Sequence, residues 1–151
     1  MDVLEAIKTR RSIRSFTDKP VPEDLITTIL DSARYAPSAG NIQPWELIIV
    51  KKQETKDLLS RAALGQGFIA EAPVVIVVCA DQRRSAMGYG DRGANLYCIQ
   101  DTAACIQNML LTAHSLGLGA CWVGAFNEEA VRSILNLSLI HISEPTRLGM
   151  I

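Results

Sequence analysis

The residues best suited to bind an anion lie close together near the start of this chain. Arg10, Arg11, Ser12 and Arg14 place three guanidinium groups and one hydroxyl within five residues. The next acidic residue along the chain is Asp18. A guanidinium suits phosphate because its planar fork donates two parallel hydrogen bonds. The segment is either a local phosphate site or an ordinary solvated run of charge, and both interpretations stay open at this point.

A second polar group lies in the stretch 37–45, which is dense in turn residues. Asn41 and Gln43 each carry an amide with donors and an acceptor, between Pro37 and Pro44. Two such amides on one rigid loop could hydrogen-bond a planar ring or a polyol chain, and loops often carry function. The alternative, which the spacing alone favours, is a helix-ending turn whose amides satisfy backbone groups.

Glycines mark a third stretch, around the apolar segment 118–126. Gly117 and Gly119 precede its centre and Gly124 follows it. A glycine at the end of a strand would let a flat ligand approach the backbone closely. The alternative is a tight turn from a strand into a helix.

The elements that must position these groups follow from periodicity and turn residues. Asp2 and Glu5 resemble a capping box at the start of a first helix. The segment 94–116 is apolar on more than one stripe, which favours a helix at the centre of the domain or between subunits. Helices mixed with strands, without strict alternation, indicate an α+β fold. We expect helices over 3–9, 22–36, 52–64, 94–116 and 127–135, strands over 46–52, 74–80 and 118–126, and a polar loop over 82–93.

Composition excludes several classes of protein. The net charge of −1 over 151 residues argues against a polyanion-binding surface, and no apolar run has the ~20 residues of a membrane helix. We therefore expect no nucleic-acid and no membrane partner. The glycines of 65–70 follow a predicted helix rather than a strand, so they do not form a dinucleotide motif. Two histidines and four cysteines without a C-x-x-C pair predict no metal site, and the thiols favour a reducing, cytoplasmic location.

Taken in order, the three groups resemble the nitroreductase family of FMN-dependent oxidoreductases. The resemblance rests on RRSIRSF, on APSAGNIQPW, and on the long segment YCIQDTAACIQNMLL that leads to GLGACWVGAF. It covers roughly residues 1–137. It implies a central mixed β-sheet flanked by helices, in a homodimer with a helical interface. It also implies FMN as cofactor and NAD(P)H as electron donor.

The resemblance also implies roles for individual residues. The N-terminal segment would hold the phosphate, the ribityl chain and the N1/O2 edge of FMN. The 37–43 loop would contact a flavin bound mainly by the other subunit, and the strand end near 124 would lie against its N5/O4 edge. The polar stretch 83–92, with Tyr89, is a hypothetical cover for the substrate slot. The cofactor-binding residues expected in this way are Arg10, Arg11, Ser12, Arg14, Pro37, Ser38, Ala39, Asn41, Gln43, Val123 and Gly124.

The last fourteen residues, 138–151, do not resemble the family, and we interpret them as an atypical tail from a shortened or shifted reading frame or from an end added in cloning. The main hypothesis for function is electron transfer from NAD(P)H to a nitroaromatic, quinone or similar small-molecule acceptor, by a ping-pong mechanism. No catalytic side chain is expected, because the flavin carries the chemistry. The alternatives are a flavin enzyme with another reaction, such as dehalogenation or flavin destruction, and a non-catalytic FMN-binding homodimer.

Overall fold

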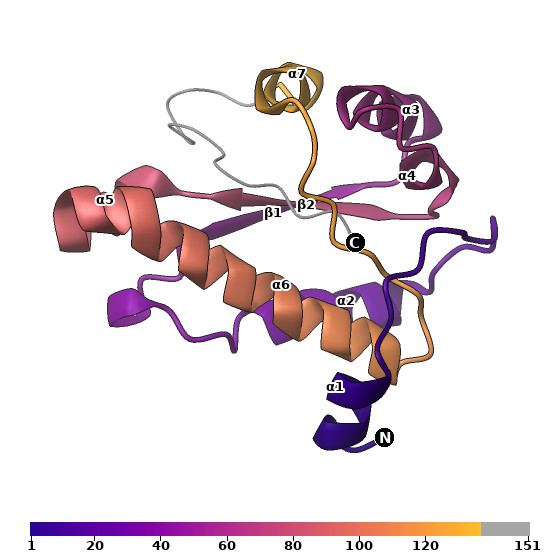
Figure 1. The fold of residues 1–151 in the computed structure, drawn as a ribbon, viewed down its shortest axis with the longest axis horizontal. Helices are drawn as coiled ribbons and strands as arrows, with labels where there is room; N and C mark the ends of the chain where they lie inside the picture. Colours follow the sequence, from indigo (N-terminus) through magenta and orange to yellow (C-terminus); the bar gives the residue numbers. More distant parts are fainter. Residues whose placement is uncertain (137–151) are drawn as a thin grey trace.

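In the computed structural model, which describes residues 1–136, a two-stranded antiparallel sheet lies between two layers of helices (Figure 1). Helices α3, α4 and α7 cover one face, and α2 and α6 cover the other. The elements in chain order are α1 (Val3–Thr9), α2 (Glu23–Ala33), the 3-10 turn η1 (Ala39–Asn41), β1 (Trp45–Val50), α3 (Gln53–Ala62), α4 (Phe68–Glu71), β2 (Val75–Ala80), α5 (Gln82–Arg92), the π-helical turn η2 (Gly93–Tyr97), α6 (Cys98–Ser115) and α7 (Glu128–Ile134).

The strands pair from Trp45 opposite Ala80 to Val50 opposite Val75, and every residue of β2 is buried. Alternate side chains of a strand point to opposite faces of the sheet. Val75, Val77 and Cys79 accordingly pack in the cluster under α3, α4 and α7. Their neighbours Ile76 and Val78 pack in the cluster under α2 and α6. The continuous apolar sequence of β2 follows from burial on both faces.

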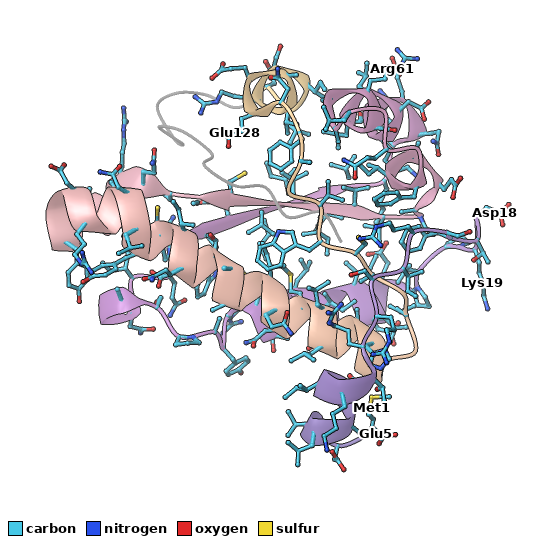
Figure 2. All side chains as sticks on the ribbon, viewed as in Figure 1. Met1, Glu5, Asp18, Lys19, Arg61 and Glu128 are labelled. Carbon is cyan, nitrogen blue, oxygen red and sulfur yellow. The ribbon has the colours of Figure 1, made fainter. Side chains whose placement is uncertain are left out.

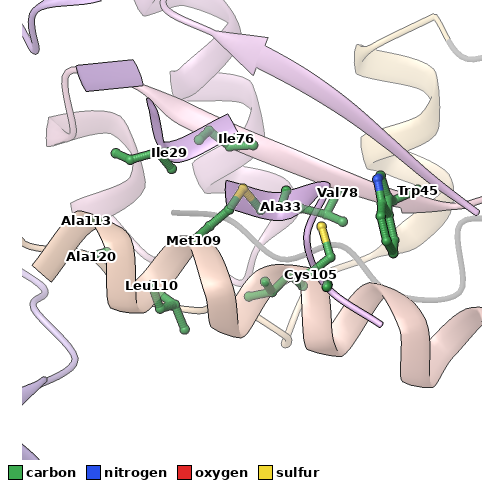
Figure 3. Close-up of a cluster of buried hydrophobic side chains, with 12 residues drawn as sticks. Ile29, Ala33, Trp45, Ile76, Val78, Cys105, Met109, Leu110, Ala113 and Ala120 are labelled. Atoms are coloured by element: carbon green, nitrogen blue, oxygen red, sulfur yellow. The ribbon is translucent and has the colours of Figure 1, made fainter. Parts of the chain in front are cut away.

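The second of these clusters fixes the long helix α6 to the sheet (Figure 3). Met109 is fully buried, and it lies near Ile29 of α2 and Ile76 of β2 in this cluster. Ala33, Ala113 and Ala120 contribute small side chains that let the backbones approach. Of the two alternatives for this apolar helix, a central position in the domain and burial between subunits, the packing within one chain supports the first.

Three helices begin at side-chain caps. The Asp2 carboxylate accepts a hydrogen bond from the Glu5 amide at 2.8 Å, so α1 begins where the capping box predicts. The Asn127 side chain accepts from the Ala130 amide at 2.9 Å at the start of α7. The Asp81 carboxylate accepts from the Arg84 amide at 3.0 Å at the start of α5. This last cap explains why residues 82–92 are helical and why the prediction of a loop there is wrong.

The α+β class is confirmed, while two other details of the prediction need correction. Residues 118–126 form no strand of a ladder, because their backbone pairs with the N-terminal segment only at the parallel bridge between Ser12 and Ala120. The helix α4 was not expected, since its four residues are too short to show a period. The predicted domain 1–137 is described to residue 136, and the predicted tail 138–151 lies outside the described residues.

The four cysteines are buried free thiols, as predicted. Burial raises the pKa of both Cys79 and Cys105 to about 12, so these thiols stay protonated at neutral pH. Within residues 1–136, no group of three or more His, Cys, Asp and Glu side chains could hold a metal ion. Over the same residues, no helix combines the length and apolarity needed to cross a membrane.

Candidate functional site

The structure brings the N-terminal arginine segment against the glycine-bearing segment near residue 120. Ser12 and Ala120 form a parallel bridge, and the Ile13 amide donates to the Ala120 carbonyl at 3.0 Å. A Cβ added at Gly119 would lie 2.9 Å from Ile13 Cγ2, so glycine permits this close contact. Two of the three groups found in the sequence are therefore neighbours, although more than 100 residues separate them.

The arginines of this segment differ in how their charge is used. Arg11 Nη1 donates to the Lys8 and Arg10 carbonyls, at 3.0 and 2.9 Å. Within residues 1–136, the side chains of Arg10 and Arg14 form neither an ion pair nor a hydrogen bond. Ser12 and Arg14 are exposed, and Arg10 is half-buried. The segment thus holds two guanidinium groups and a hydroxyl without partners in the described chain, which suits an added anion.

A small cavity of about 140 Å³ adjoins these arginines, and its polar lining is Thr9, Arg10, Arg11 and His114. The Thr9 hydroxyl donates to the Glu5 carbonyl at 2.7 Å, so it accepts from His114 Nε2 at 2.8 Å. This contact ties α1 to the last turn of α6. Sequence reasoning missed His114, because nothing along the chain links it to Thr9.

The two residues expected at the end of the 118–126 segment have different environments. Val123 is 3% exposed and packs in the core cluster beneath α3 and α7. Gly124 is exposed, and a Cβ added there would meet nothing within 4 Å. The Val123 side chain therefore supports the fold, while space for a ligand exists beside Gly124.

The 37–43 loop is held at both ends by its neighbours. The Ala39 amide lies 3.3 Å from both carboxylate oxygens of Asp101, in the first turn of α6. The Gln43 amide donates to Ser38 Oγ at 3.0 Å. Arg84 of α5 donates through Nη1 to the Gln43 carbonyl at 2.8 Å. Pro37, at the start of the loop, is exposed. These contacts hold the backbone of the loop in place.

The backbone of this loop is unusual. Gly40, Asn41 and Gln43 have φ of 59°, 54° and 55°, in the left-handed region that few side chains adopt. Glycine adopts this conformation without strain, whereas at the non-glycine residues Asn41 and Gln43 it costs of order 1 kcal/mol or more and is typical of functional sites. The strained backbone turns the two amides toward each other, and Gln43 Nε2 donates to Asn41 Oδ1 at 2.9 Å. Both side-chain N–H groups of Asn41 and the side-chain oxygen of Gln43 remain without a partner within residues 1–136.

Asp101 anchors the loop from a desolvated position. Asp101 is only 7% exposed. Burial raises the pKa of Asp101, and the hydrogen bond from the Ala39 amide opposes that shift. No signal in the sequence marked Asp101 as the anchor, since it reads as one polar residue of an apolar helix.

The arginine segment and the 37–43 loop lie at opposite ends of α6. Asp101 in its first turn binds the loop, and His114 in its last turn binds Thr9. The 18 residues of α6 make it about 27 Å long. Within one chain, therefore, the arginine segment and the segment near residue 120 are neighbours, and the 37–43 loop is distant from both.

Comparison with known proteins identifies the family. The sequence model of the nitroreductase family matches residues 7–67 and 57–148. This chain belongs to the nitroreductase family. A relative from Methanothermobacter thermautotrophicus, provisionally named an NADH dehydrogenase/NAD(P)H nitroreductase, is 43% identical over 138 residues, which cover 91% of this chain and 69% of that protein. A Bacillus subtilis FMN reductase [NAD(P)H] is 32% identical over 90% of this nitroreductase-family chain and 60% of its own length.

Solved structures agree with the family assignment. NfrA1 of B. megaterium matches with a TM-score of 0.84 and 35% identity, over 98% of this chain and 64% of that one. The NADPH:FMN oxidoreductase of Vibrio harveyi, complexed with NAD+, matches with a TM-score of 0.86 and 28% identity, over 97% and 66% of the two chains. This nitroreductase-family chain thus spans about two thirds of those structures.

Proposed function

We propose that this chain is an FMN-dependent oxidoreductase that transfers electrons from NAD(P)H to a nitroaromatic, a quinone or a similar small molecule. The observation that carries the proposal is the pair of guanidinium groups of Arg10 and Arg14, which have no partner within residues 1–136 and flank the backbone bridge between Ser12 and Ala120. Relatives named FMN reductase and NADPH-flavin oxidoreductase support both the cofactor and the donor.

The described residues fit the chemistry of FMN. Arg10, Ser12 and Arg14 offer donors to a phosphate dianion and to a ribityl chain. The open space beside Gly124 would admit a flat ring close to the backbone. The side-chain N–H groups of Asn41 and the side-chain oxygen of Gln43, which lack partners in the described part of the chain, complement a heterocycle that both accepts and donates hydrogen bonds. Phosphate, chain and ring thus each have a matching group.

When bound, FMN supplies the hydride-accepting and electron-donating chemistry, so the protein needs no acid or base of its own. The role of the chain is to hold and orient the cofactor and to stabilise the charge that develops on it. A guanidinium of Arg10 or Arg14 near the N1/O2 edge would stabilise negative charge that develops there. NAD(P)H and the acceptor would occupy the same space in turn, which gives ping-pong kinetics.

The separation of the two groups along α6 supports a homodimer in which each site takes its arginine segment from one copy and its loop from the other. A second copy would also cover the apolar face of α1, where Val3, Leu4 and Ile7 are 66%, 62% and 54% exposed. Exposed apolar patches commonly mark interfaces. The four reduced thiols support a cytoplasmic location.

An absorbance titration of the purified protein with FMN tests the proposal. We expect bound flavin that bleaches with NADH or NADPH under anaerobic conditions and recovers with a quinone. Light scattering should give twice the mass of the chain. Bound flavin that ignores both nicotinamides would favour a non-catalytic FMN-binding dimer, and a chain that takes up no FMN would refute the proposal.

A further inference from the structure

The junction between α5 and η2 carries features that lie outside the FMN site proposed above. Gly90 has φ of 58° and breaks α5 near its end, and residues 93–97 form a π-helical turn. Gly93 lies so close to Ser85 that a Cβ would be 2.4 Å from the Ser85 carbonyl oxygen. Single π-helical turns inside helices occur frequently at functional sites. The tight junction fixes the direction of the side chains around it.

Two tyrosines and an arginine form a cluster at this junction. The rings of Tyr89 and Tyr97 pack edge to face, with centroids 5.1 Å apart. Arg92 lies over the Tyr97 ring, with Cζ 5.3 Å from the centroid, and its Nε donates to the Tyr97 hydroxyl at 3.0 Å. The ring and the hydroxyl together fix the plane of the guanidinium.

The cluster adjoins the 37–43 loop. A Cβ added at Gly40 would lie 2.7 Å from the Tyr89 hydroxyl oxygen, so this ring packs directly on the loop. At the preceding residue of α5, a Cβ added at Gly88 would lie 2.6 Å from Ile42 Cδ1. Tyr89 is nevertheless 42% exposed, which leaves part of its ring available to a ligand.

Arg92 has binding capacity left over. It is exposed, and only its Nε is used within residues 1–136, so both terminal nitrogens lack a protein partner there. No carboxylate of the described chain pairs with it. An arginine with a structural role donates its terminal N–H groups to the protein. Arg84 does so, to the Gln43 carbonyl and to the carboxylates of Glu46 and Asp81.

We propose that Arg92, held on Tyr97, is a subsite for the anionic group of an aromatic ligand that enters beside the 37–43 loop. The anion would be the carboxylate of an acceptor or the 2′-phosphate of NADPH, and the shared chemistry is a pair of anionic oxygens on one atom that accept two parallel hydrogen bonds from a guanidinium. Tyr89 and Tyr97 would contact the aromatic part of the ligand. This inference rests on the proposed function, because it places the ligand at the flavin-binding loop.

The experiment compares matched charged and neutral ligands in the FMN-loaded protein. The acceptor pair is 4-nitrobenzoate and 4-nitrobenzamide, and the donor pair is NADPH and NADH. Arg92→Gln should lower kcat/KM for the charged member of one pair, relative to the neutral member, by roughly three- to tenfold. Calorimetric binding of 4-nitrobenzoate to the oxidised protein should weaken by a similar factor if the acceptor is the source of the anion.

Two further variants sharpen the test. Arg61→Gln removes the same charge from α3, on the sheet face opposite α6, and should leave both ratios unchanged (Figure 2). Tyr97→Phe keeps the ring but removes the hydroxyl that holds Nε, so it should lower the ratio by less than Arg92→Gln does.

The outcomes separate this inference from the proposed function. A change in the acceptor ratio assigns the subsite to the acceptor, and a change in the donor ratio assigns it to the NADPH phosphate. If Arg92→Gln binds FMN and turns over the neutral ligands normally but changes neither ratio, the subsite is refuted while the proposed function stands. If the unaltered chain takes up no FMN, both are refuted.

Discussion

The arginine segment and the 37–43 loop are built in opposite ways. In the first, Arg10 and Arg14 keep their guanidinium groups free of protein partners within residues 1–136. In the second, Asp101, Ser38 and Arg84 hold the backbone in place. The segment supplies charge that a ligand must neutralise, whereas the loop supplies a rigid surface that a ligand must fit. Changes in the segment should therefore alter affinity, and changes in the loop should alter stability and shape.

The largest effect should come from the free guanidinium groups. Arg10→Ala and Arg14→Ala should each weaken FMN binding by roughly ten- to a hundredfold, because hydrogen bonds to charged groups contribute about 1.5–3 kcal/mol. Arg11→Ala should have a smaller effect, since Arg11 already donates to the Lys8 and Arg10 carbonyls. A fluorescence titration with FMN measures this, with Arg61→Ala as the control. Equal losses of FMN affinity in all three variants would contradict the distinction between Arg11 and the two arginines without partners.

A pair of glycine variants separates the contact that holds the segment from the space beside it. Gly119→Ala should destabilise the fold by about 1–3 kcal/mol in urea unfolding, because its Cβ would lie 2.9 Å from the β-branched Ile13 side chain. Gly124→Ala has open space and should change the unfolding free energy by less than about 0.5 kcal/mol while weakening FMN binding. Unchanged FMN affinity in Gly124→Ala would exclude a close approach of the ring there.

In the loop, Ser38→Ala should cost about 1 kcal/mol of stability, because the Gln43 amide loses its acceptor at 3.0 Å. FMN affinity should fall less than in Arg14→Ala, since the loop keeps its contacts with Asp101 and Arg84. Thermal unfolding and the same titration measure the two quantities. A variant as weak in FMN binding as Arg14→Ala would show that the Ser38 hydroxyl itself contacts the flavin.

The smallest effect concerns the charge of Asp101. Its pKa is raised from the ordinary value of 3.8, so the folded state holds the proton more tightly than the unfolded state does. The stability that this supplies is complete below pH 3.8 and is lost as pH rises through the raised pKa. As pH rises from acidic to neutral, the stability of Asp101→Asn should therefore increase relative to that of the unaltered chain. A difference in melting temperature that does not vary with pH would contradict this.

The sequence predicted the local features well and the long-range ones poorly. The helix α1 follows from Asp2 and Glu5, and α6 follows from its apolar period. The contact between Ser12 and Ala120 could not be predicted, because it joins two irregular segments at one bridge. The hydrogen bond from the Ala39 amide to Asp101 could not be predicted either, because a single buried carboxylate in an apolar helix forms no recognisable sequence pattern.

The helicity of α5 shows a different limit. Glycines at 88 and 90 argued for a loop, yet Asp81 caps the helix and the packing of Gly93 on Ser85 stabilises the turn that follows. Tertiary contacts outweigh local propensity at this point. The same contacts place Tyr89 on the flavin-binding loop proposed above, so this error in the prediction fell on the region proposed to bind the substrate.

The length of α6 has a genetic consequence. If each site combines the arginine end of one copy with the loop end of another, a chain lacking Arg10 and Arg14 and a chain lacking the Asn41 and Gln43 amides have complementary defects. Neither should be active alone. Mixed dimers would contain one site with both defects and one with neither, so random mixing should restore about a quarter of the original activity. Two inactive alleles would then complement each other inside one cell.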